Sequence, residues 1–246
     1  MLTDPQLFNE YAYARNNPLM YVDPLGEAIQ LSNDPAEQEG ELNAICSAAG
    51  ILPGQCSYYL YANAVKDSNG NTSYYVGIYT NGADAKGTSF QNPNDVAAAI
   101  GSVINDQRVV QLDLVAPGTT VTDIHEMEET IGPVDVDRNI APGATYQDSS
   151  GNWHIALLDP STAPGTLPSY YMTNDQSGVL NQGIIFGHEL GHLKKEWSLT
   201  AFERFEQDDF NIPVSDPAAV DLENKVRKLQ NPNAPTRKGH NPPPPQ

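Results

Sequence analysis

The chain has 246 residues, a length that fits one large domain, or one domain with appendages, and allows a sizeable hydrophobic core. Apolar residues make up 39% of it, and 13 Lys and Arg residues against 31 Asp and Glu residues give a formal net charge of −18. This composition is that of a folded chain, and its negative charge excludes a nucleic-acid binder that works mainly by neutralising phosphates.

Neither a membrane span nor a signal peptide is predicted. The sequence contains no run of about 18 apolar residues, which a membrane-spanning helix would need. Met1 to Pro5 lack the basic start and the apolar core of a signal peptide. We therefore expect any export to follow another route.

The first 26 residues differ from the rest of the chain. They contain Tyr11-Ala12-Tyr13, then Asn16-Asn17-Pro18, and end in Asp23-Pro24-Leu25-Gly26, a pattern typical of a strand followed by turns. This run resembles the end of an RHS-repeat core, a family in which a β-shell encloses a variable C-terminal toxin. The resemblance implies that residues 1–26 end such a core at the Asp-Pro-x-Gly junction, with a toxin domain after it.

Residues 27–57 are of mixed composition, and we interpret them as a linker with a short helix over 42–49. Cys46 and Cys56 lie ten residues apart in this region. Their spacing allows a small disulfide loop in an oxidising compartment, and two buried thiols are an equally good interpretation. A zinc ribbon is excluded because neither cysteine belongs to a CxxC motif.

The middle of the chain alternates between strand and helix signals. Asp67 to Asn71 separates two aromatic and β-branched runs within 57–80, and Asp148 to Gly151 separates two more, at 145–147 and 153–158, so each predicts a β-hairpin. The spacing of apolar residues predicts a helix over 93–105 and a strand over 109–115. Without a regular βαβ repeat, this order favours an α+β fold.

A domain over 58–232 is expected, followed by a Pro-rich tail over 233–246 that cannot pack as a core.

The most informative segment of this domain is Gly187-His188-Glu189-Leu190-Gly191-His192. It lies in a predicted helix over 179–197 with Ser177 as the candidate N-cap. His188 and His192 share one helix face, so their imidazoles can converge on one Zn²⁺. Glu189 then lies beside the metal, where a carboxylate can act as general base for water.

Three glycines, Gly183, Gly187 and Gly191, recur every fourth residue along this helix. Each costs about 1 kcal/mol in helix propensity relative to alanine. We expect the row to serve close packing, a functional need, or both.

A catalytic zinc site needs a third protein ligand. Glu203 lies nearby in sequence, but Thr200 and Glu203 form a capping-box pattern that already explains it. Asp221 and Glu223 lie in a predicted helix that starts at Asp216-Pro217, and each has a basic residue four positions later. Helical periodicity does not decide between these two.

Three motifs in the last third of the chain resemble those of the M91-type zinc metallopeptidase effector domain. They are the HExxH motif at 188–192, Glu223-Asn224-Lys225-Val226-Arg227, and Arg237-Lys238-Gly239-His240. The resemblance implies a zincin-like fold with a small mixed or antiparallel sheet, an active-site helix and a C-terminal helix. It implies that His188, His192 and Glu223 bind zinc, with Asp221 as the alternative third ligand, that Glu189 is the base, and that Arg227, Arg237 and His240 support the site.

Zincin-like proteases commonly bind substrate along an edge strand above the metal helix. The strand that contains Trp153, His154, Ile155 and Ala156 is the nearest upstream, and we expect it to be that edge. His154 is interpreted as a surface residue of this strand. The segment 125–129 begins like a second HExxH motif but has no second histidine, so we interpret it as a solvated acidic turn.

Together these patterns predict a zinc-dependent endopeptidase that is the toxin domain of an RHS protein. The RHS resemblance implies a protein substrate in a target cell, a cognate immunity protein, and secretion or delivery without a cleavable signal peptide in this segment. One alternative is a zinc amidohydrolase that acts on a cell-wall peptide. The other is a non-catalytic binding module in which a metal only stabilises the fold.

Overall fold

A computed structural model describes residues 29–52, 54–79, 94–106, 108–132, 140–159, 167–168, 179–198 and 217–237. Within these ranges the protein has an α+β fold with mixed sheets, as the sequence predicts. The RHS-like segment 1–26, Ser177, the capping-box pattern at 200–203 and His240 lie outside the described residues. Among the helices that are described, none has the length and apolarity to span a membrane.

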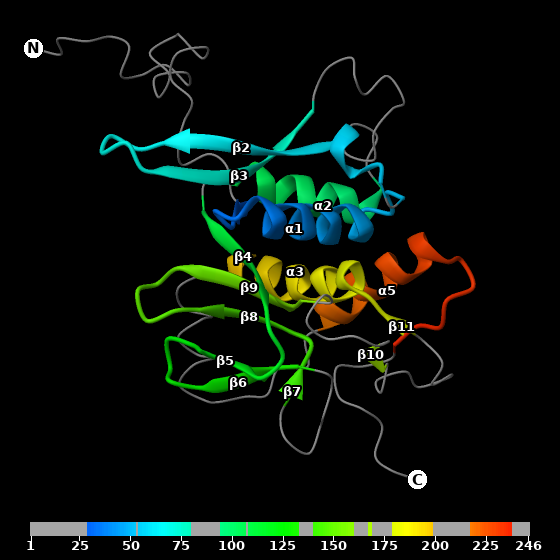
Figure 1. Ribbon diagram of the computed structural model, residues 1–246. Coiled ribbons are helices and arrows are strands. Elements are labelled where there is room, and N and C mark those ends of the chain that lie inside the picture. The colour runs from blue at the N-terminus through cyan, green and yellow to red at the C-terminus, as the bar shows by residue number, and fades with distance from the viewer. Residues whose placement is uncertain are drawn as a thin grey trace, which may run out of the picture.

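The central element is a six-stranded sheet with the strand order β2-β3-β1-β4-β9-β8. Its strands are β1 (Ile29–Leu31), β2 (Leu60–Lys66), β3 (Thr72–Ile78), β4 (Val110–Val115), β8 (Gly143–Gln147) and β9 (Trp153–Leu158). The central strands β1, β4 and β9 run parallel, whereas β2–β3, β3–β1 and β9–β8 pair antiparallel. In Figure 1 the β2–β3 and β8–β9 hairpins therefore lie at opposite ends of the sheet, with α1 and α3 between them.

The described helices are α1 (Pro35–Ala48), α2 (Asp95–Ile104), α3 (Gln182–Ser198) and α5 (Pro217–Gln230), with a short 3₁₀ turn, η3 (Cys56–Tyr58). Asp34 and Asn94 cap α1 and α2 by accepting hydrogen bonds from backbone N–H groups of the first turn. The cap of α3 is Asn181, whose Oδ1 accepts from the N–H of Ile184. The predicted cap at Ser177 is thus four residues too early, because β11 precedes the helix.

Two smaller sheets complete the fold. One has the order β5-β6-β7, from Thr119–Thr122, Glu128–Ile131 and Ile140–Ala141, and the other pairs β10 (Leu167–Pro168) with β11 (Val179–Leu180). Val121 of β5 and Ile131 of β6 pack with Ala156 and Leu158 of β9. The β5-β6-β7 sheet therefore covers one face of the main sheet at its β8–β9 end.

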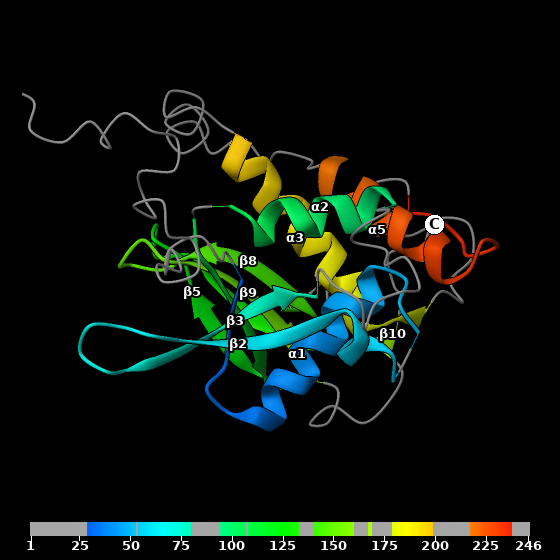
Figure 2. The ribbon, with the colours of Figure 1, turned by 90° about the horizontal axis from the view of Figure 1, so that it is seen from above.

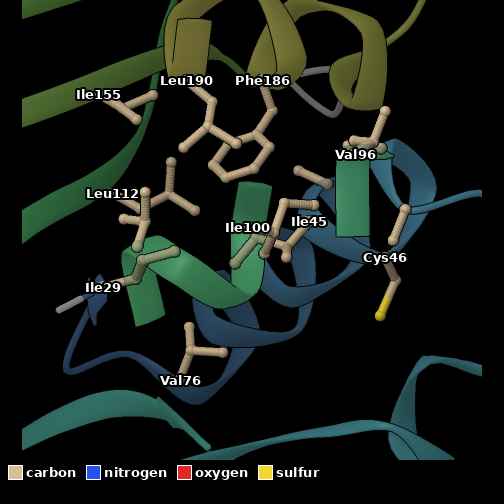
Figure 3. Packing of buried hydrophobic residues seen from close by; sticks show 14 of the residues in the cluster. Ile29, Ile45, Cys46, Val76, Val96, Ile100, Leu112, Ile155, Phe186 and Leu190 are labelled. Atoms are coloured by element: carbon tan, nitrogen blue, oxygen red, sulfur yellow. The ribbon is translucent and has the colours of Figure 1, made fainter. Parts of the chain in front are cut away.

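The larger core lies on the other face, between the sheet and the helices. Ile155 and Leu157 of β9 contribute to it, in alternation with the residues that face the smaller sheet. Phe186 and Leu190 of α3 point into this core toward residues of α1 and α2 (Figure 3). Seen from above, α2, α3 and α5 gather on one side of the sheet (Figure 2). The core thus fixes α3 by its apolar face.

Residues 27–57, expected to be a linker with a short helix, instead supply part of the fold. β1 pairs with β3 and β4 in the middle of the sheet, and α1 is a 14-residue helix with Ala44, Ile45 and Ala48 in the core. A three-residue strand has too little sequence pattern to be recognised, and the signal of α1 is weakened by its many polar residues. Cys46 and Cys56 form a disulfide, which decides between the two alternatives left open by the sequence.

The two predicted hairpins, the helix over 93–105 and the strand over 109–115 are confirmed as β2–β3, β8–β9, α2 and β4. The carboxylates of Asp67 and Asp148 each accept hydrogen bonds from backbone N–H groups of their own turn. This explains why both turns could be predicted from local sequence. The predicted tail is described as far as Arg237, and this part packs against α5.

The glycine row of α3 allows two helices to approach closely. A Cβ added at Gly183 would lie 2.6 Å from the backbone nitrogen of Ala48 in α1, and one at Gly187 would lie 2.5 Å from Cγ2 of Val226 in α5. At Gly191 it would collide with Cα of Ala219, also in α5. The packing role expected for these glycines is therefore confirmed, and it accounts for their cost in helix propensity.

The disulfide should stabilise the folded domain. For a loop of this length we expect its loss to lower the free energy of unfolding by about 2–3 kcal/mol. The measurement is urea unfolding of the wild type with and without a reductant, with the double variant Cys46→Ala and Cys56→Ala as control. If the urea midpoint of the wild type is the same with and without the reductant, the expectation is contradicted.

Replacing Gly191 by alanine should force α3 and α5 apart. Overpacking of this kind lowers the free energy of unfolding by about 1–3 kcal/mol. Gly101 in α2 is the matched control, because nothing lies within 4 Å of an added Cβ there. Gly101→Ala should instead stabilise the protein by up to about 1 kcal/mol. Thermal unfolding of the two variants measures both effects, and equal shifts would refute the close-packing account.

Candidate metal centre

Helix α3 brings His188 and His192 together on the face opposite its core-facing side chains. Their rings meet edge to face, and the two Nε2 atoms are 3.2 Å apart. Two nitrogens bound to one tetrahedral zinc at the usual 2.0–2.1 Å are about 3.3 Å apart. Both the chemistry of these donors and their spacing therefore fit a zinc ion held by the two Nε2 atoms.

Glu223 of α5 contacts His188 from the opposite side of the imidazole ring. Its Oε2 atom is 2.8 Å from Nδ1, whereas the Nε2 atom of the same ring faces His192. A carboxylate at Nδ1 does not reach a metal at Nε2, so this geometry does not fit Glu223 as the third ligand. Among the described residues, no three His, Cys, Asp or Glu side chains group as a metal site would require.

Two arginines surround the carboxylate of Glu223, which is only 2% exposed. Arg227 donates to Oε1 from Nε and Nη2 at 3.0 and 2.8 Å, and Arg237 donates to Oε2 from Nη1 at 2.9 Å. Burial alone would raise the pKa of Glu223, but the hydrogen bond with His188 and the charges of both arginines outweigh it and lower the pKa to about 2. The carboxylate is therefore ionised at neutral pH.

Asp221, the alternative third ligand, points away from the histidines. Its side chain is 65% exposed and pairs with Lys225 at 2.9 Å on the outer face of α5. Periodicity does not separate Asp221 from Glu223, but the packing of α5 on α3 does, because it buries Glu223 and leaves Asp221 in solvent. In this structure the carboxylate of Asp221 therefore does not lie with the two histidines.

Glu189, the predicted base, lies on the side of α3 that faces β8. It is 5% exposed, and its Oε2 atom accepts a hydrogen bond of 3.0 Å from the hydroxyl of Thr145. The same hydroxyl is 2.9 Å from the backbone carbonyl of Glu189. Gly143 lies next to it on β8, where an added Cβ would come within 3.1 Å of the Glu189 carboxylate. Strand β8 thus determines where this carboxylate lies.

The predicted substrate strand is wrong by one position in the sheet. Strand β9, which contains Trp153, His154, Ile155 and Ala156, lies between β4 and β8 and is not an edge. The edge strand beside α3 is β8. His154 faces away from α3, stacks on Tyr146 and contacts Asp113 at 3.0 Å. Its side chain is only 12% exposed, so it is more buried than the surface residue that the sequence predicts.

Two residues near the site were missed by the sequence interpretation. Thr145 stands in a predicted strand, and strand alternation places it on the same face as Ile155, which would have indicated that it faces α3. Glu129 was assigned to a solvated turn, yet it lies on β6 and is partly buried. Burial raises its pKa to about 7, the charge of Glu189 adds to this rise, and His192 opposes it, so Glu129 lies within electrostatic reach of the site.

A polar hollow of about 750 Å³ lies between α1, the main sheet and β5. Acidic residues from α1 and the sheet line it, among them Glu41, Asp113 and Asp148. Glu41 is fully buried, and both of its carboxylate oxygens approach the N–H of Ser32. Burial is the main cause that raises the pKa of Glu41 to about 8. This carboxyl is therefore protonated through most of the neutral range.

In comparisons with known proteins the chain matches no family model, no curated protein and no solved structure. The residues that bear on its function are the convergent pair His188 and His192, the buried carboxylate of Glu189 beside β8, and the cluster of Glu223, Arg227 and Arg237 at Nδ1 of His188.

Replacing Glu41 by glutamine should change how stability depends on pH. The folded pKa is raised from 4.5 to about 8, so the contribution of Glu41 is fully present below pH 4.5 and is lost as pH rises through about 8. Glutamine keeps an oxygen for the Ser32 N–H but does not titrate. We expect the unfolding midpoint of Glu41→Gln to rise relative to wild type between about pH 5 and pH 8. The exposed Glu39→Gln on the same helix is the control, and parallel profiles for all three proteins would refute the assignment.

Proposed function

We propose that this chain carries a zinc-dependent endopeptidase that acts as the toxin domain of an RHS polymorphic toxin. One observation carries the proposal: His188 and His192 present their Nε2 atoms 3.2 Å apart, with the buried carboxylate of Glu189 on the next residue of the same helix. The motif resemblance to the M91-type metallopeptidases supports a zincin-like architecture for this site. The N-terminal resemblance to an RHS core supports its role as a delivered toxin.

In the proposed reaction, His188 and His192 hold the metal and Glu189 moves the proton. When bound, zinc supplies Lewis acidity, which polarises the substrate carbonyl and lowers the pKa of water. Glu189 accepts a proton from the attacking water and passes it to the nitrogen of the leaving amine. The hydroxyl of Thr145 orients the Glu189 carboxylate for both steps.

The substrate would lie along β8. Within the described part of the main sheet this strand pairs only with β9, so its outer edge can accept an extended peptide by β-augmentation. Gly143 and Thr145 lie on the face of β8 that contacts Glu189. A peptide on this edge would pass close to the proposed base, which supports a protein substrate rather than a compact small molecule.

The biological setting follows from the RHS resemblance and forms part of the same proposal. The shell would be the RHS core, the substrate a protein of the target cell, and the producer would need a cognate immunity protein. Delivery would replace a cleavable signal peptide in this segment. The charge of −18 supports a basic protein as one of these partners, because opposite charges steer association.

The function is tested by adding the zinc-loaded protein to a target-cell lysate and sequencing the new protein termini. Glu189→Gln should bind one zinc and keep the fold but lose cleavage by at least about 100-fold, because it removes the base. Glu39→Gln, an exposed change on α1, is the matched control and should cleave like the wild type.

The outcomes separate the three candidate functions. New protein termini that depend on Glu189 support the endopeptidase. Release of amino groups from cell-wall fragments without new protein termini would favour the amidohydrolase. Bound zinc with neither activity would favour the binding module, and a wild type that binds no zinc would refute all three.

A further inference from the structure

The contact between Glu223 and His188 determines which nitrogen of the imidazole carries the proton. Each carboxylate oxygen is only an acceptor, and Oε2 lies 2.8 Å from Nδ1. Nδ1 is therefore the donor, and in a neutral imidazole the lone pair then lies on Nε2. This is the nitrogen that faces His192 at 3.2 Å. The lone pair of His188 is thus directed to the place where the histidines converge.

Glu223 is itself fixed by groups from two parts of the chain. Arg227 approaches Oε1 from the same helix, one turn further on, and Arg237 approaches Oε2 from the segment after the helix. Both guanidinium groups are buried with the carboxylate. Four hydrogen bonds of 3.0 Å or less, from one histidine and two arginines, would leave the carboxylate little freedom to turn toward a metal.

Arg237 is held in place by Asn224, the neighbour of Glu223 on α5. The amide of Asn224 donates to the backbone carbonyl of Arg237 and accepts from its backbone N–H, both at 2.7 Å. This pair of hydrogen bonds fastens residues 231–237 to the helix. The segment thereby supplies one of the two cations beside Glu223.

We propose that Glu223 is a positioning residue of the metal centre and not a zinc ligand. It holds His188 as the Nδ1–H tautomer, with Nε2 directed to the metal position, and residues 231–237 complete this arrangement through Arg237. The inference rests on the zinc site of the proposed function. Partners of this kind behind a metal-binding histidine fix its ring and raise its basicity.

The first test needs no variant. In the zinc-free, ¹⁵N-labelled full chain, the ring nitrogen shifts of His188 report its tautomer by NMR, with His188→Gln to assign the signal. Recorded at a pH where the ring is neutral, a proton on Nδ1 supports the proposal, and a proton on Nε2 overturns it. This measurement does not depend on zinc. It therefore distinguishes failure of the positioning role of Glu223 from failure of the proposed function.

The second test measures zinc affinity by competition with a chelator. Glu223→Gln should weaken zinc binding by about 10- to 100-fold without abolishing it, because the metal keeps both histidines. Asp221→Asn is the matched control on the same helix and should bind like the wild type. Unchanged affinity in Glu223→Gln overturns the proposal, and so does complete loss of zinc from a folded variant, which would mark Glu223 as a ligand.

Because Glu223→Gln leaves two buried arginines with a neutral partner, a variant outside the ion cluster is needed as well. Asn224→Ala loosens residues 231–237 but keeps every charge. It should lower zinc affinity by about 3- to 10-fold, less than the loss of the carboxylate itself. If Glu223→Gln does not fold, this variant decides: weaker binding supports the role of the segment, and wild-type affinity overturns it.

Discussion

The close approach of α3 to its neighbours is the constraint on which the rest of the site depends. At Gly183 the end of α1 packs directly against the backbone of α3, and at Gly187 and Gly191 α5 does the same. At these distances an ordinary helix pair with side chains at every contact would not fit. The same approach brings the carboxylate of Glu223 within 2.8 Å of His188, one residue from Gly187. Gly187, Gly191 and the buried polar cluster therefore belong to the same contact between α3 and α5.

Burial of so many charges calls for an explanation other than stability. The desolvation free energy of a carboxylate and two guanidinium groups is about as large as the electrostatic attraction between them. A buried ion cluster therefore contributes little net free energy to folding. Such a cluster instead fixes the orientation of the Glu223 carboxylate, because each donor holds one of its oxygens in place. On the opposite side of α3, Thr145 fixes Glu189 with a single hydroxyl. The helix is thus held between a charged support behind His188 and a neutral one beside Glu189.

Features set by local sequence were predictable, and those set by distant pairing were not. The turn at Asp67 bonds its own backbone, and the apolar spacing of α2 is visible within ten residues, so both could be recognised. In contrast, β1 takes its place from β3 and β4, and whether β8 or β9 is the edge depends on the partner of β9 across about forty residues. Within the candidate site, the HExxH spacing predicted that His188 and His192 lie together with Glu189 beside them. Asp221 and Glu223 lie on different sides of α5, and only Glu223 lies on the side that meets α3. No local sequence pattern predicts which side that is.

The position of β1 has a mechanical consequence. Ile29 lies three residues after Gly26, a stretch that spans at most about 11 Å even when fully extended. The first strand to follow is in the middle of the sheet, bonded on both sides. A force applied to the chain ahead of Ile29 would thus load the centre of the sheet first, instead of peeling away an outer strand. Passage of this domain through a narrow channel from its N-terminal end would begin by breaking the sheet in two.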